Sequence, residues 1–308
     1  MKILVTGGAG FIGSHVADRM LSDGHQVLIV DDLSTGRERN LPSRADFERL
    51  DVRTPALEEL VLRVRPEAIF HLAAQIDVRR SVADPVLDAD INVLGTVRLA
   101  KAAALAGCQH VLFSSTGGAI YGEQDTFPAD EDHACRPVSP YGASKLCAEA
   151  MLGYFARAGG PRVTCLRYAN VYGPRQDPHG EAGVVAIFCG LLLAGKAPTI
   201  HGDGLQTRDF VYVGDVAEAN LRALTRGQGG VFNVGTGVET DVNTIARLLI
   251  QASGFEGQAR HAPAKPGEQR RSSIDPGRAL RELGWRPTVD LAEGLGRTLE
   301  YFRGLEAS

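Results

Sequence analysis

The chain has 308 residues, a hydrophobic content of 44%, a charged content of 23% and a formal net charge of −4. These values are those of an ordinary globular protein with a large core and one or two domains. Because the lysines and arginines are scattered along the sequence, its charge argues against a nucleic-acid groove as the main function.

The cysteines and the apolar runs indicate the compartment. The five cysteines form no C-x-x-C pair, which predicts reduced thiols without a zinc site or a disulfide framework. The amino terminus, MKILVTGG, is typical of a strand rather than of a signal peptide. The longest apolar run, VVAIFCGLLLAG at residues 184–195, is too short to span a bilayer. We therefore expect a cytoplasmic protein with no membrane partner and no metal site.

In chain order, the first half alternates short strand-like runs with amphipathic helical stretches. The runs are KILVTG, QVLIVD, ADFERLD, AIFHLA, HVLFSS and RVTCLRY, which begin at Lys2, Gln26, Ala45, Ala68, His110 and Arg162. Between them lie helical patterns such as SHVADRMLSDG and SKLCAEAMLGYFARAG. This alternation predicts an α/β fold with a doubly wound parallel Rossmann sheet and right-handed crossovers.

The pattern becomes less regular after about residue 170. Segments rich in glycine and proline appear there, such as YGPRQDPHGEAG and APAKPGEQRR, together with further helices. We expect a Rossmann domain over residues 1–169, with a returning segment at 209–235. Residues 170–308 would form mainly a smaller α/β domain on the substrate side.

The first predicted strand runs into a glycine-rich turn. TGGAGFIG places Gly7, Gly10 and Gly13 in a G-x-x-G-x-x-G pattern, with a strand before it and a helix after it. Glycines allow a tight turn and let a pyrophosphate approach the backbone, and the helix N-terminus offers unpaired N–H groups. The pattern therefore predicts a dinucleotide site, although a turn that only caps a helix has similar glycines.

The second strand ends in two carboxylates that select the dinucleotide. Asp31 and Asp32 follow the glycines by roughly 20 residues, where a carboxylate accepts the adenosine ribose hydroxyls and repels a 2′-phosphate. This favours NAD over NADP. Arg37 is the exception, since an arginine near this site could receive a phosphate.

A tyrosine precedes a lysine by four residues in SPYGASK, at the start of a predicted helix. The spacing places Tyr141 and Lys145 on one helical face, which by itself is an ordinary surface arrangement. Beside a nicotinamide the pair gains a function, because hydride leaves a carbinol carbon only when the hydroxyl proton is removed. A tyrosine of pKa about 10 is a poor base at neutral pH, and a nearby ammonium favours its phenolate.

Three hydroxyl residues end the strand that precedes this helix. Ser114, Ser115 and Thr116 stand at its carboxyl end, where ligands bind in such sheets. We expect Thr116 to hydrogen-bond the reacting oxygen, with Ser115 as the second choice. The alternative is that these hydroxyls satisfy local backbone groups.

Taken together, these motifs resemble the extended short-chain dehydrogenase/reductase family, and most closely its NAD-dependent epimerases and dehydratases of the UDP-glucose 4-epimerase type. The resemblance runs nearly end to end, through TGGAGFIGS, DDLSTG, HLAAQ, SSTGGAIYG, SPYGASK, LRYANVYGPRQ, RDFVYVGDVAEA, FNVGTG and GWRPTVDLAEGL. The set is specific for the family and less specific for the individual reaction.

The resemblance implies the residues that contact the cofactor, NAD. Asp51 and Val52 would flank the adenine, and a group after the fourth strand would line the cofactor. The full implied set is Gly7, Gly10, Phe11, Ile12, Gly13, Asp31, Asp32, Asp51, Val52, Leu72, Ala73, Ala74, Gln75, Tyr141 and Lys145. Thr116, Tyr141 and Lys145 match the catalytic positions.

The resemblance also implies a clamp for the diphosphate of a UDP-sugar substrate. Asn170 would contact the diphosphate, and Arg208 matches an arginine that suits it because its donors are planar and fixed. A second clamp is expected in KPGEQRR. The family often has Arg-x-Gly-Asp there, whereas this chain has Lys265 and Glu268, so Lys265, Arg270 and Arg271 compete for the role. A solvated basic loop is the alternative.

The loop after the threonine bears on the reaction. In this family 4,6-dehydratases carry an acidic pair there, as in T-D-E-V-Y-G, and decarboxylases carry a glutamate. This chain has Gly117 and Gly118, with no carboxylate before Glu123, in a loop one residue longer. We therefore expect an isomerase that interconverts UDP-glucose and UDP-galactose through transient C4 oxidation with tightly bound NAD. The alternatives are a dehydratase, decarboxylase or reductase of the family and, more distantly, a non-catalytic NAD-binding protein.

Two further expectations follow from the resemblance. Ser272 aligns with the residue that walls off the sugar 2-substituent, where a bulky aromatic would exclude an N-acetyl group and serine leaves room. This suggests activity on UDP-N-acetylhexosamines as well.

The helices around DADINVLGTVRLAKAAALA and from YGASK are rich in small and apolar residues. In the family that the chain resembles, these helices pair across a two-fold axis, which predicts a homodimer. Burial inside the monomer would explain the same composition.

Overall fold

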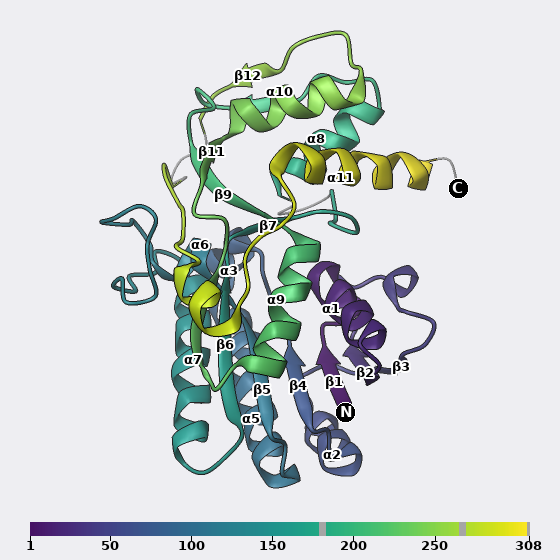
Figure 1. The fold of residues 1–308 in the computed structure, drawn as a ribbon, viewed down its shortest axis with the longest axis vertical. Coiled ribbons are helices and arrows are strands. Elements are labelled where there is room, and N and C mark those ends of the chain that lie inside the picture. Colours follow the sequence, from purple (N-terminus) through teal and green to yellow (C-terminus); the bar gives the residue numbers. More distant parts are fainter. Residues whose placement is uncertain (179–182, 265–268, 307–308) are drawn as a thin grey trace.

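The fold is built on one parallel sheet. A computed structural model describes residues 1–178, 183–264 and 269–306. Seven parallel strands pair in the order β10-β6-β5-β4-β1-β2-β3 (Figure 1). Their bounds are β1 Lys2–Thr6, β2 Gln26–Asp31, β3 Asp46–Arg49, β4 Ala68–His71, β5 His110–Thr116, β6 Arg162–Tyr168 and β10 Gly230–Val234. The predicted Rossmann sheet and its first six strands are confirmed.

Helices cover both faces of this sheet. Buried side chains of α1 (Phe11–Ser22) and α9 (Val213–Arg226) pack on one face. Those of α2 (Pro55–Val64), α5 (Gly95–Ala106) and α7 (Pro140–Arg157) pack on the other. Short elements fill the connections: η1 Glu38–Asn40, α3 Val78–Ala83, α4 Pro85–Ala89, η2 Asp90–Leu94, α6 Gly117–Ile120 and η3 Ala279–Leu283.

Two smaller sheets and three helices form a second hydrophobic unit. One sheet has the order β11-β9-β7 and the other joins β12 to β8. The elements are β7 Asn170–Tyr172, α8 Val184–Leu193, β8 Thr199–His201, β9 Thr207–Tyr212, β11 Glu239–Asp241, α10 Val242–Ser253, β12 Arg260–Ala262 and α11 Leu291–Glu306. The chain therefore leaves the main sheet after β6, returns through α9 and β10, and leaves again. The division into two domains at residue 170 stays a prediction.

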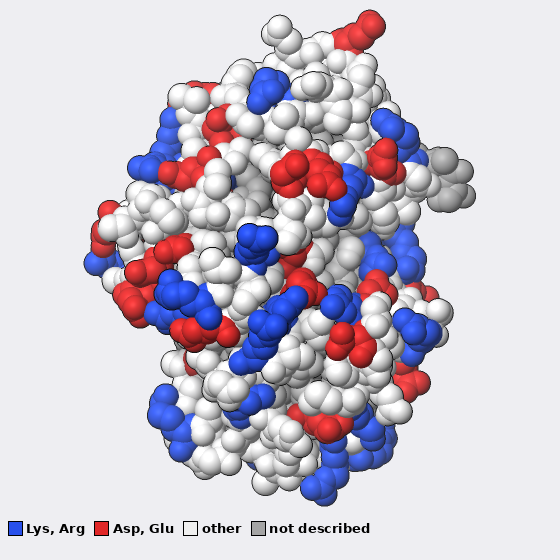
Figure 2. Space-filling model, viewed as in Figure 1, with Lys and Arg blue, Asp and Glu red and all other residues white. Residues whose placement is uncertain are grey.

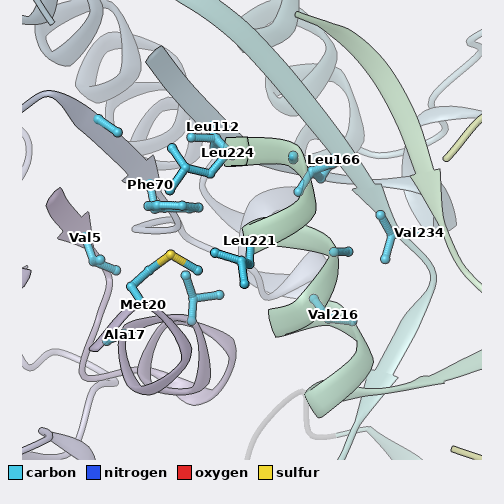
Figure 3. Close-up of a cluster of buried hydrophobic side chains, with 14 of the residues drawn as sticks. Val5, Ala17, Met20, Phe70, Leu112, Leu166, Val216, Leu221, Leu224 and Val234 are labelled. Carbon is cyan, nitrogen blue, oxygen red and sulfur yellow. The ribbon is translucent and has the colours of Figure 1, made fainter. Parts of the chain in front are cut away.

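The core between α1 and α9 shows why these helices form where they do. Met20 of α1 points toward Leu221 of α9, and Leu224 of α9 lies beside Phe70 of β4 (Figure 3). Before its last residue, the positions of α9 that are not buried, 214, 218, 222 and 225, recur every three or four residues, so a single helical face is left toward solvent. Each large apolar side chain on the buried side contributes about 1.5–3 kcal/mol by leaving water.

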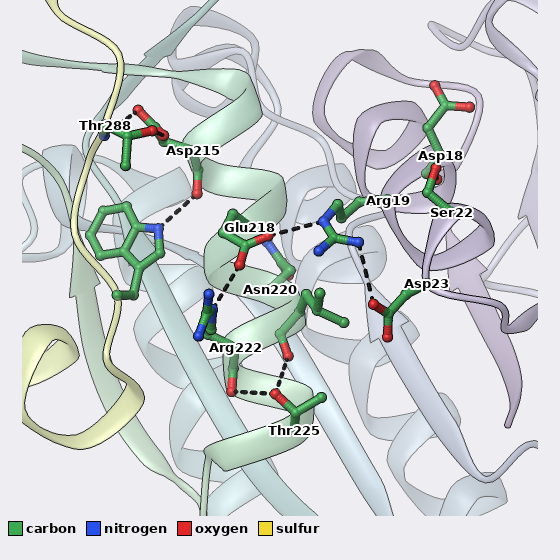
Figure 4. A network of polar contacts seen from close by, with 12 residues as sticks. Asp18, Arg19, Ser22, Asp23, Asp215, Glu218, Asn220, Arg222, Thr225 and Thr288 are labelled. Carbon is green, nitrogen blue, oxygen red and sulfur yellow. Dashed lines mark hydrogen bonds and ion pairs between the residues drawn. The ribbon is translucent and has the colours of Figure 1, made fainter.

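Polar contacts fix the outer surface of the same pair of helices. Arg19 of α1 donates to Glu218 of α9 at 2.9 Å, and Glu218 also accepts from Arg222 at 2.7 Å (Figure 4). Near the start of α9, the backbone carbonyl of Asp215 accepts the indole N–H of Trp285 at 2.9 Å. The carboxylate of Asp215 accepts the Thr288 hydroxyl at 2.7 Å. The C-terminal segment is thereby attached to the helix that returns to the main sheet.

A short strap after β7, residues 174–177, connects the second unit to the glycine-rich side of the main sheet. Three contacts hold it: Pro174 O accepts from His15 Nε2 at 2.9 Å, Arg175 donates to Asp18 at 2.7 Å, and Arg37 donates to Asp177 at 2.8 Å. His15 and Asp18 lie on α1, whereas Arg37 follows β2. The strap therefore bridges both sides of the glycine turn.

The surface carries charges of both signs. Basic and acidic side chains are interspersed over the face drawn in Figure 2. Among the helices in the described part of the chain, none combines the length and the apolar character that crossing a membrane requires.

Candidate active site

The glycine turn forms a cradle for a diphosphate at the carboxyl end of β1. Gly7 has a φ of +71°, and a Cβ added there would lie 2.6 Å from Ala73 N. A Cβ at Gly13 would lie 2.1 Å from Gly7 O, so the turn packs directly on the first turn of α1. Gly10 caps α1 without a side chain, which leaves the first-turn N–H groups of Phe11 and Ile12 to an anion. These features fit NAD.

The carboxylates after β2 lie beside this cradle. Asp31 accepts hydrogen bonds from Ala9 N at 3.0 Å and Leu33 N at 2.9 Å, and burial raises the pKa of its carboxyl group. Asp32 accepts from the backbone and hydroxyl of Ser34. Arg37, the residue that could have received a 2′-phosphate, is ion-paired with a carboxylate of the strap. This arrangement suits ribose hydroxyls.

Asp51 and Val52 lie at the edge of the same groove. Arg53 donates to both carboxylate oxygens of Asp51, and this pairing lowers the pKa of the carboxyl group. Val52 is buried, and a Cβ added at Gly95 would lie 3.2 Å from its Cγ2. The side chain of Asp51 is thus engaged with Arg53.

The segment after β4 approaches the glycine turn. Leu72, Ala73 and Ala74 are half-buried, and the backbone N–H of Ala73 donates to Thr6 Oγ1 at 3.3 Å. Gln75 differs from them, because it is buried and its amide donates to Asp88 Oδ1 at 2.9 Å. The side chain of Gln75 therefore serves a buried network, and it is the backbone of this segment that borders the cradle.

The structure brings Thr116 and Tyr141 together. Tyr141 lies in the first turn of α7, and Thr116 is the last residue of β5. Burial and the charge of Asp88 together raise the pKa of the Tyr141 phenol to about 12, against the lowering effect of a hydrogen bond with Thr116. The phenol thus needs added positive charge to act as a base near neutral pH.

Lys145 is buried one helical turn further along α7. Its Nζ donates to Ser114 O at 2.9 Å and lies 4.7 Å from the centre of the Phe113 ring. Burial lowers the pKa of this ammonium to about 8. The ammonium is thus held by the carbonyl at the end of β5, and its expected action on the Tyr141 phenol stays a prediction.

The other two hydroxyls at the end of β5 point elsewhere. Ser115 donates to Glu149 Oε1 at 2.5 Å, within a buried pair in which Arg167 contacts both carboxylate oxygens of Glu149. Ser114 hydrogen-bonds Tyr168. Thr116 is therefore the better placed partner for a reacting oxygen, and Ser115 belongs to the network behind the site.

Asn170 faces the same space as Thr116. A Cβ added at Gly118 would lie 3.6 Å from Asn170 Oδ1 and 3.9 Å from Thr116 Oγ1. Asn170 is exposed at the start of β7, so its amide is accessible to a ligand. The glycine at position 118 keeps this space open between the two side chains.

The residues expected to clamp the diphosphate are more scattered. Arg208 lies on β9 and donates to Thr207 O at 2.7 Å. Arg270 forms a two-point pair with Asp203, and Arg271 pairs with Glu239 while stacking on the Phe127 ring at 3.8 Å. Ser272 is buried. Lys265 and Glu268 lie outside the described residues.

Several buried polar groups were not predicted from the sequence. Asp88 accepts from Gln75, Asn92 and Ser144, and is completely buried. Asp209, next to Arg208, is also buried and accepts from Thr236 and its neighbours. No local motif distinguishes these two aspartates, because their partners are distant in sequence.

Comparison with known proteins agrees with this site. Residues 3–235 match the NAD dependent epimerase/dehydratase family. A UDP-glucose 4-epimerase from Mycolicibacterium smegmatis is 49% identical, over 98% of this chain and 99% of that protein.

Two solved structures resemble the whole chain. A UDP-glucose 4-epimerase from Thermotoga maritima with UDP-glucose has a TM-score of 0.97 and 47% identity, covering 99% of this chain and 100% of that one. A UDP-glucose 4-epimerase from Thermus thermophilus in complex with NAD has a TM-score of 0.93 and 44% identity, covering 99% of each. The chain belongs to the NAD-dependent epimerase/dehydratase family.

Proposed function

We propose that this protein is a UDP-hexose 4-epimerase that interconverts UDP-glucose and UDP-galactose with tightly held NAD. The observation that carries the proposal is the meeting of Thr116 and Tyr141 at the carboxyl end of β5, in the sheet that holds the glycine cradle. Gly117 and Gly118 follow Thr116 in the loop where the family resemblance implies acids in dehydratases and decarboxylases, although the loop of this chain is one residue longer. The site thus has the groups for C4 oxidation and lacks a carboxylate there for a second reaction.

In the proposed mechanism Tyr141 accepts the proton of the sugar 4-hydroxyl while Thr116 hydrogen-bonds the same oxygen. When bound in the glycine cradle, NAD would supply the hydride acceptor for C4 and the positive charge of its oxidised ring. Lys145 adds a second positive charge below its pKa of about 8. Tyr141 returns the proton when the sugar is reduced, so the protein ends each cycle unchanged.

Asn170 and Arg208 are proposed to hold the diphosphate while the sugar turns over about its phosphate link. An arginine fork fixes a diphosphate in one orientation and leaves the sugar free to present either face. Among the candidates for a second clamp, Arg270 and Arg271 are each already paired with a carboxylate. A diphosphate would have to displace one of these exposed pairs, which solvent already weakens.

The test is incubation of the purified protein with UDP-glucose without added NADH. A 4-epimerase forms UDP-galactose, whereas a net redox enzyme changes the absorbance of free NADH. The Tyr141→Phe variant should lose about 10²–10⁴-fold in kcat while retaining its NAD. Tyr301→Phe, in α11 of the second unit, is the control. Unchanged turnover in Tyr141→Phe would refute the assigned base.

The substrate range is proposed to include UDP-N-acetylhexosamines. Ser272 is small and buried, in a segment that runs beside the loop after α6, where Ala129 N donates to Ser273 O at 3.0 Å. Steady-state rates on UDP-glucose and UDP-N-acetylglucosamine should show Ser272→Tyr losing the second activity selectively. An unchanged ratio of the two rates would mean that Ser272 does not border the 2-substituent.

We also propose a homodimer, and a cytoplasmic location in view of five free cysteines. The outer face of α7 carries Ala143, Cys147, Ala150 and Tyr154 at helical spacing, all exposed and none charged. On the neighbouring α5, Leu105 is 64% exposed. A helix face without charged side chains is normally covered, and the two-fold pairing of this family makes a second copy the proposed cover.

Light scattering should give twice the chain mass of 32.9 kDa. Ala150→Arg should yield monomers, because a guanidinium charge cannot be buried in an interface of small residues. Cys147 should then become reactive toward a thiol reagent. Leu280→Arg, an equally drastic change at a 51% exposed residue of η3, should remain dimeric. A monomeric wild type would refute the proposal.

A further inference from the structure

Asp88 of α4 is a buried carboxylate held by three neutral donors. Its Oδ1 accepts from Gln75 Nε2 at 2.9 Å and from Asn92 Nδ2 at 3.1 Å, and its Oδ2 accepts from Ser144 Oγ at 2.6 Å. The residue has no exposed surface, and none of the ion pairs among the described residues includes it. A buried carboxylate without a paired cation is costly, so its retention needs a reason.

The donors come from three places that border the active site. Gln75 follows β4 in the segment beside the glycine cradle, Asn92 lies in η2, and Ser144 lies in α7. Ser144 stands between the candidate base Tyr141 and Lys145 in sequence. Asp88 thus connects the cofactor side of the sheet to the first turns of α7.

A second contact holds the same end of α7. Tyr141 N donates to Ser81 Oγ of α3 at 3.2 Å, and Ser81 is buried. The start of α7 is therefore tied at Tyr141 by α3 and at Ser144 by α4. Both contacts are made by side chains rather than by the packing of apolar surfaces.

The positive charges of Lys145 and Arg167 are matched by equal negative charge only when Asp88 is included with Glu149. Lys145 donates to a backbone carbonyl rather than to a carboxylate. Glu149, the other acid that acts on Lys145, is already neutralised by two hydrogen bonds from Arg167 at 3.0 and 2.7 Å. Asp88 is the remaining negative charge that favours the protonated form of Lys145.

The other titratable groups around Asp88 do not supply this balance. On α7, the charge of Asp88 acts on Tyr141 and Lys145. Glu149, His71 and Cys165 interact electrostatically with Lys145. Burial lowers the pKa of His71 to about 3, so that ring is neutral, and burial keeps the Cys165 thiol protonated by raising its pKa. On α3 and η2, Arg79 and Arg80 are exposed and Asp90 lies 3.6 Å from Arg53.

We propose that Asp88 is a positioning residue for the reaction: its carboxylate fixes α7 against the cofactor-facing segment and supplies the counter-charge for the Lys145 ammonium. The inference rests on the proposed epimerase function for its kinetic consequences. Its charge also opposes ionisation of Tyr141, so the phenol returns its proton readily when the sugar is reduced. Removing the charge should make both groups lose their protons at lower pH.

The variant Asp88→Asn tests this with little change in shape. Its Oδ1 can still accept from Gln75 and Asn92, and its amide can donate to the hydroxyl oxygen of Ser144, so each of the three contacts is kept, with the direction of the Ser144 bond reversed. Both limbs of the pH profile of kcat should move to lower pH by about one unit or more. Asp84→Asn is the control, because it removes the same charge four residues earlier and an asparagine caps α4 as well as an aspartate does.

Unchanged limbs in Asp88→Asn would overturn the proposal, whatever the size of the loss in kcat. A second measurement, on cofactor-free protein, does not depend on the reaction. Asp88→Asn should lower the melting temperature in the wild-type background and raise it in the Lys145→Met background, where the carboxylate has lost its counter-charge.

If Asp88→Asn changes the melting temperature equally in the wild-type and Lys145→Met backgrounds, Asp88 and Lys145 are not charge partners. If Asp88→Asn alone fails to fold, folding of the double variant supports the proposal and failure of the double variant refutes it. If the protein shows no epimerase activity but the melting temperatures change sign as expected, the proposed function fails and the charge pairing stands.

Discussion

Gly118 shows how one missing side chain shapes the site. Its φ is not in the left-handed region, and an added Cβ would meet only Asn170 and Thr116, at ordinary contact distances. In α6 an alanine is about 1 kcal/mol more favourable than a glycine. The residue is therefore not required by the backbone, and we infer that it keeps space for the substrate.

Gly118→Ala should accordingly separate stability from activity. We expect an unchanged or slightly higher melting temperature, unchanged NAD content, and a KM for UDP-glucose raised about tenfold or more, because a methyl group occupies space between two substrate contacts. Thermal denaturation and steady-state kinetics measure the two effects. An unaltered KM would place the sugar elsewhere.

At the residue scale, the sequence predicted the groups that stand in local motifs. Gly7, Tyr141 and Thr116 were visible because their spacing reflects one turn of chain or one helical face. The sequence could not show that Ser115 donates to Glu149, or that Asp88 holds α7. These contacts join residues 34 and 56 positions apart, and only the packed sheet decides them.

Helix α1 shows how a glycine can be required by packing rather than by φ. A Cβ at Gly13 would lie 2.1 Å from Gly7 O, so the helix can approach the turn only because that atom is absent. Gly296 in α11 has no atom within 4 Å of its added Cβ. Gly13 and Gly296 are therefore matched positions for comparing glycine-to-alanine substitutions in a helix.

Gly13→Ala should lower the free energy of unfolding by about 1–3 kcal/mol and weaken NAD binding, because the helix must move away from the cradle. Gly296→Ala should raise the free energy of unfolding by about 1 kcal/mol, since no neighbouring atom opposes the better helix propensity of alanine. Urea denaturation and NAD titration test both variants. A stabilised Gly13→Ala would contradict the close packing of the turn on α1.

At the scale of elements, strand existence was predictable and strand pairing was less so. Runs of β-branched and apolar residues identified β1, β2, β4, β5 and β6, because buried parallel strands read as continuous apolar segments. The edge strand β3, DFER, is mostly exposed and has no such run. The run FVYV was expected to return to the main sheet, whereas β9 pairs with β7 and β11. Local composition specifies a strand but not its neighbours.

At the scale of the whole molecule, the strap at residues 174–177 ties the second unit to the glycine side of the main sheet. Its contacts reach α1 on one side of the cradle and Arg37 on the other, and Arg37 N donates to Ala9 O within the glycine turn at 3.0 Å. We expect departure of NAD to require that this strap separate from α1.

The double variant Asp18→Ala, Asp177→Ala should therefore release NAD about fivefold faster or more, since each half-exposed pair contributes up to about 1 kcal/mol. Rapid dilution into an NAD-trapping enzyme measures the rate. Glu48→Ala, which removes an exposed pair with Arg63, is the control. Equal release rates in all three proteins would show that the strap does not retain the cofactor.

The position of β10 at the edge of the main sheet affects folding during synthesis on the ribosome. This strand pairs with β6 through residues 230–234, long after the rest of the sheet has left the ribosome. Until then the backbone of β6 presents an open row of unpaired N–H and C=O groups, a template for other chains. A nascent or truncated chain ending before residue 230 should thus be prone to aggregate, and chaperones that shield strand edges should bind it in preference to the finished protein.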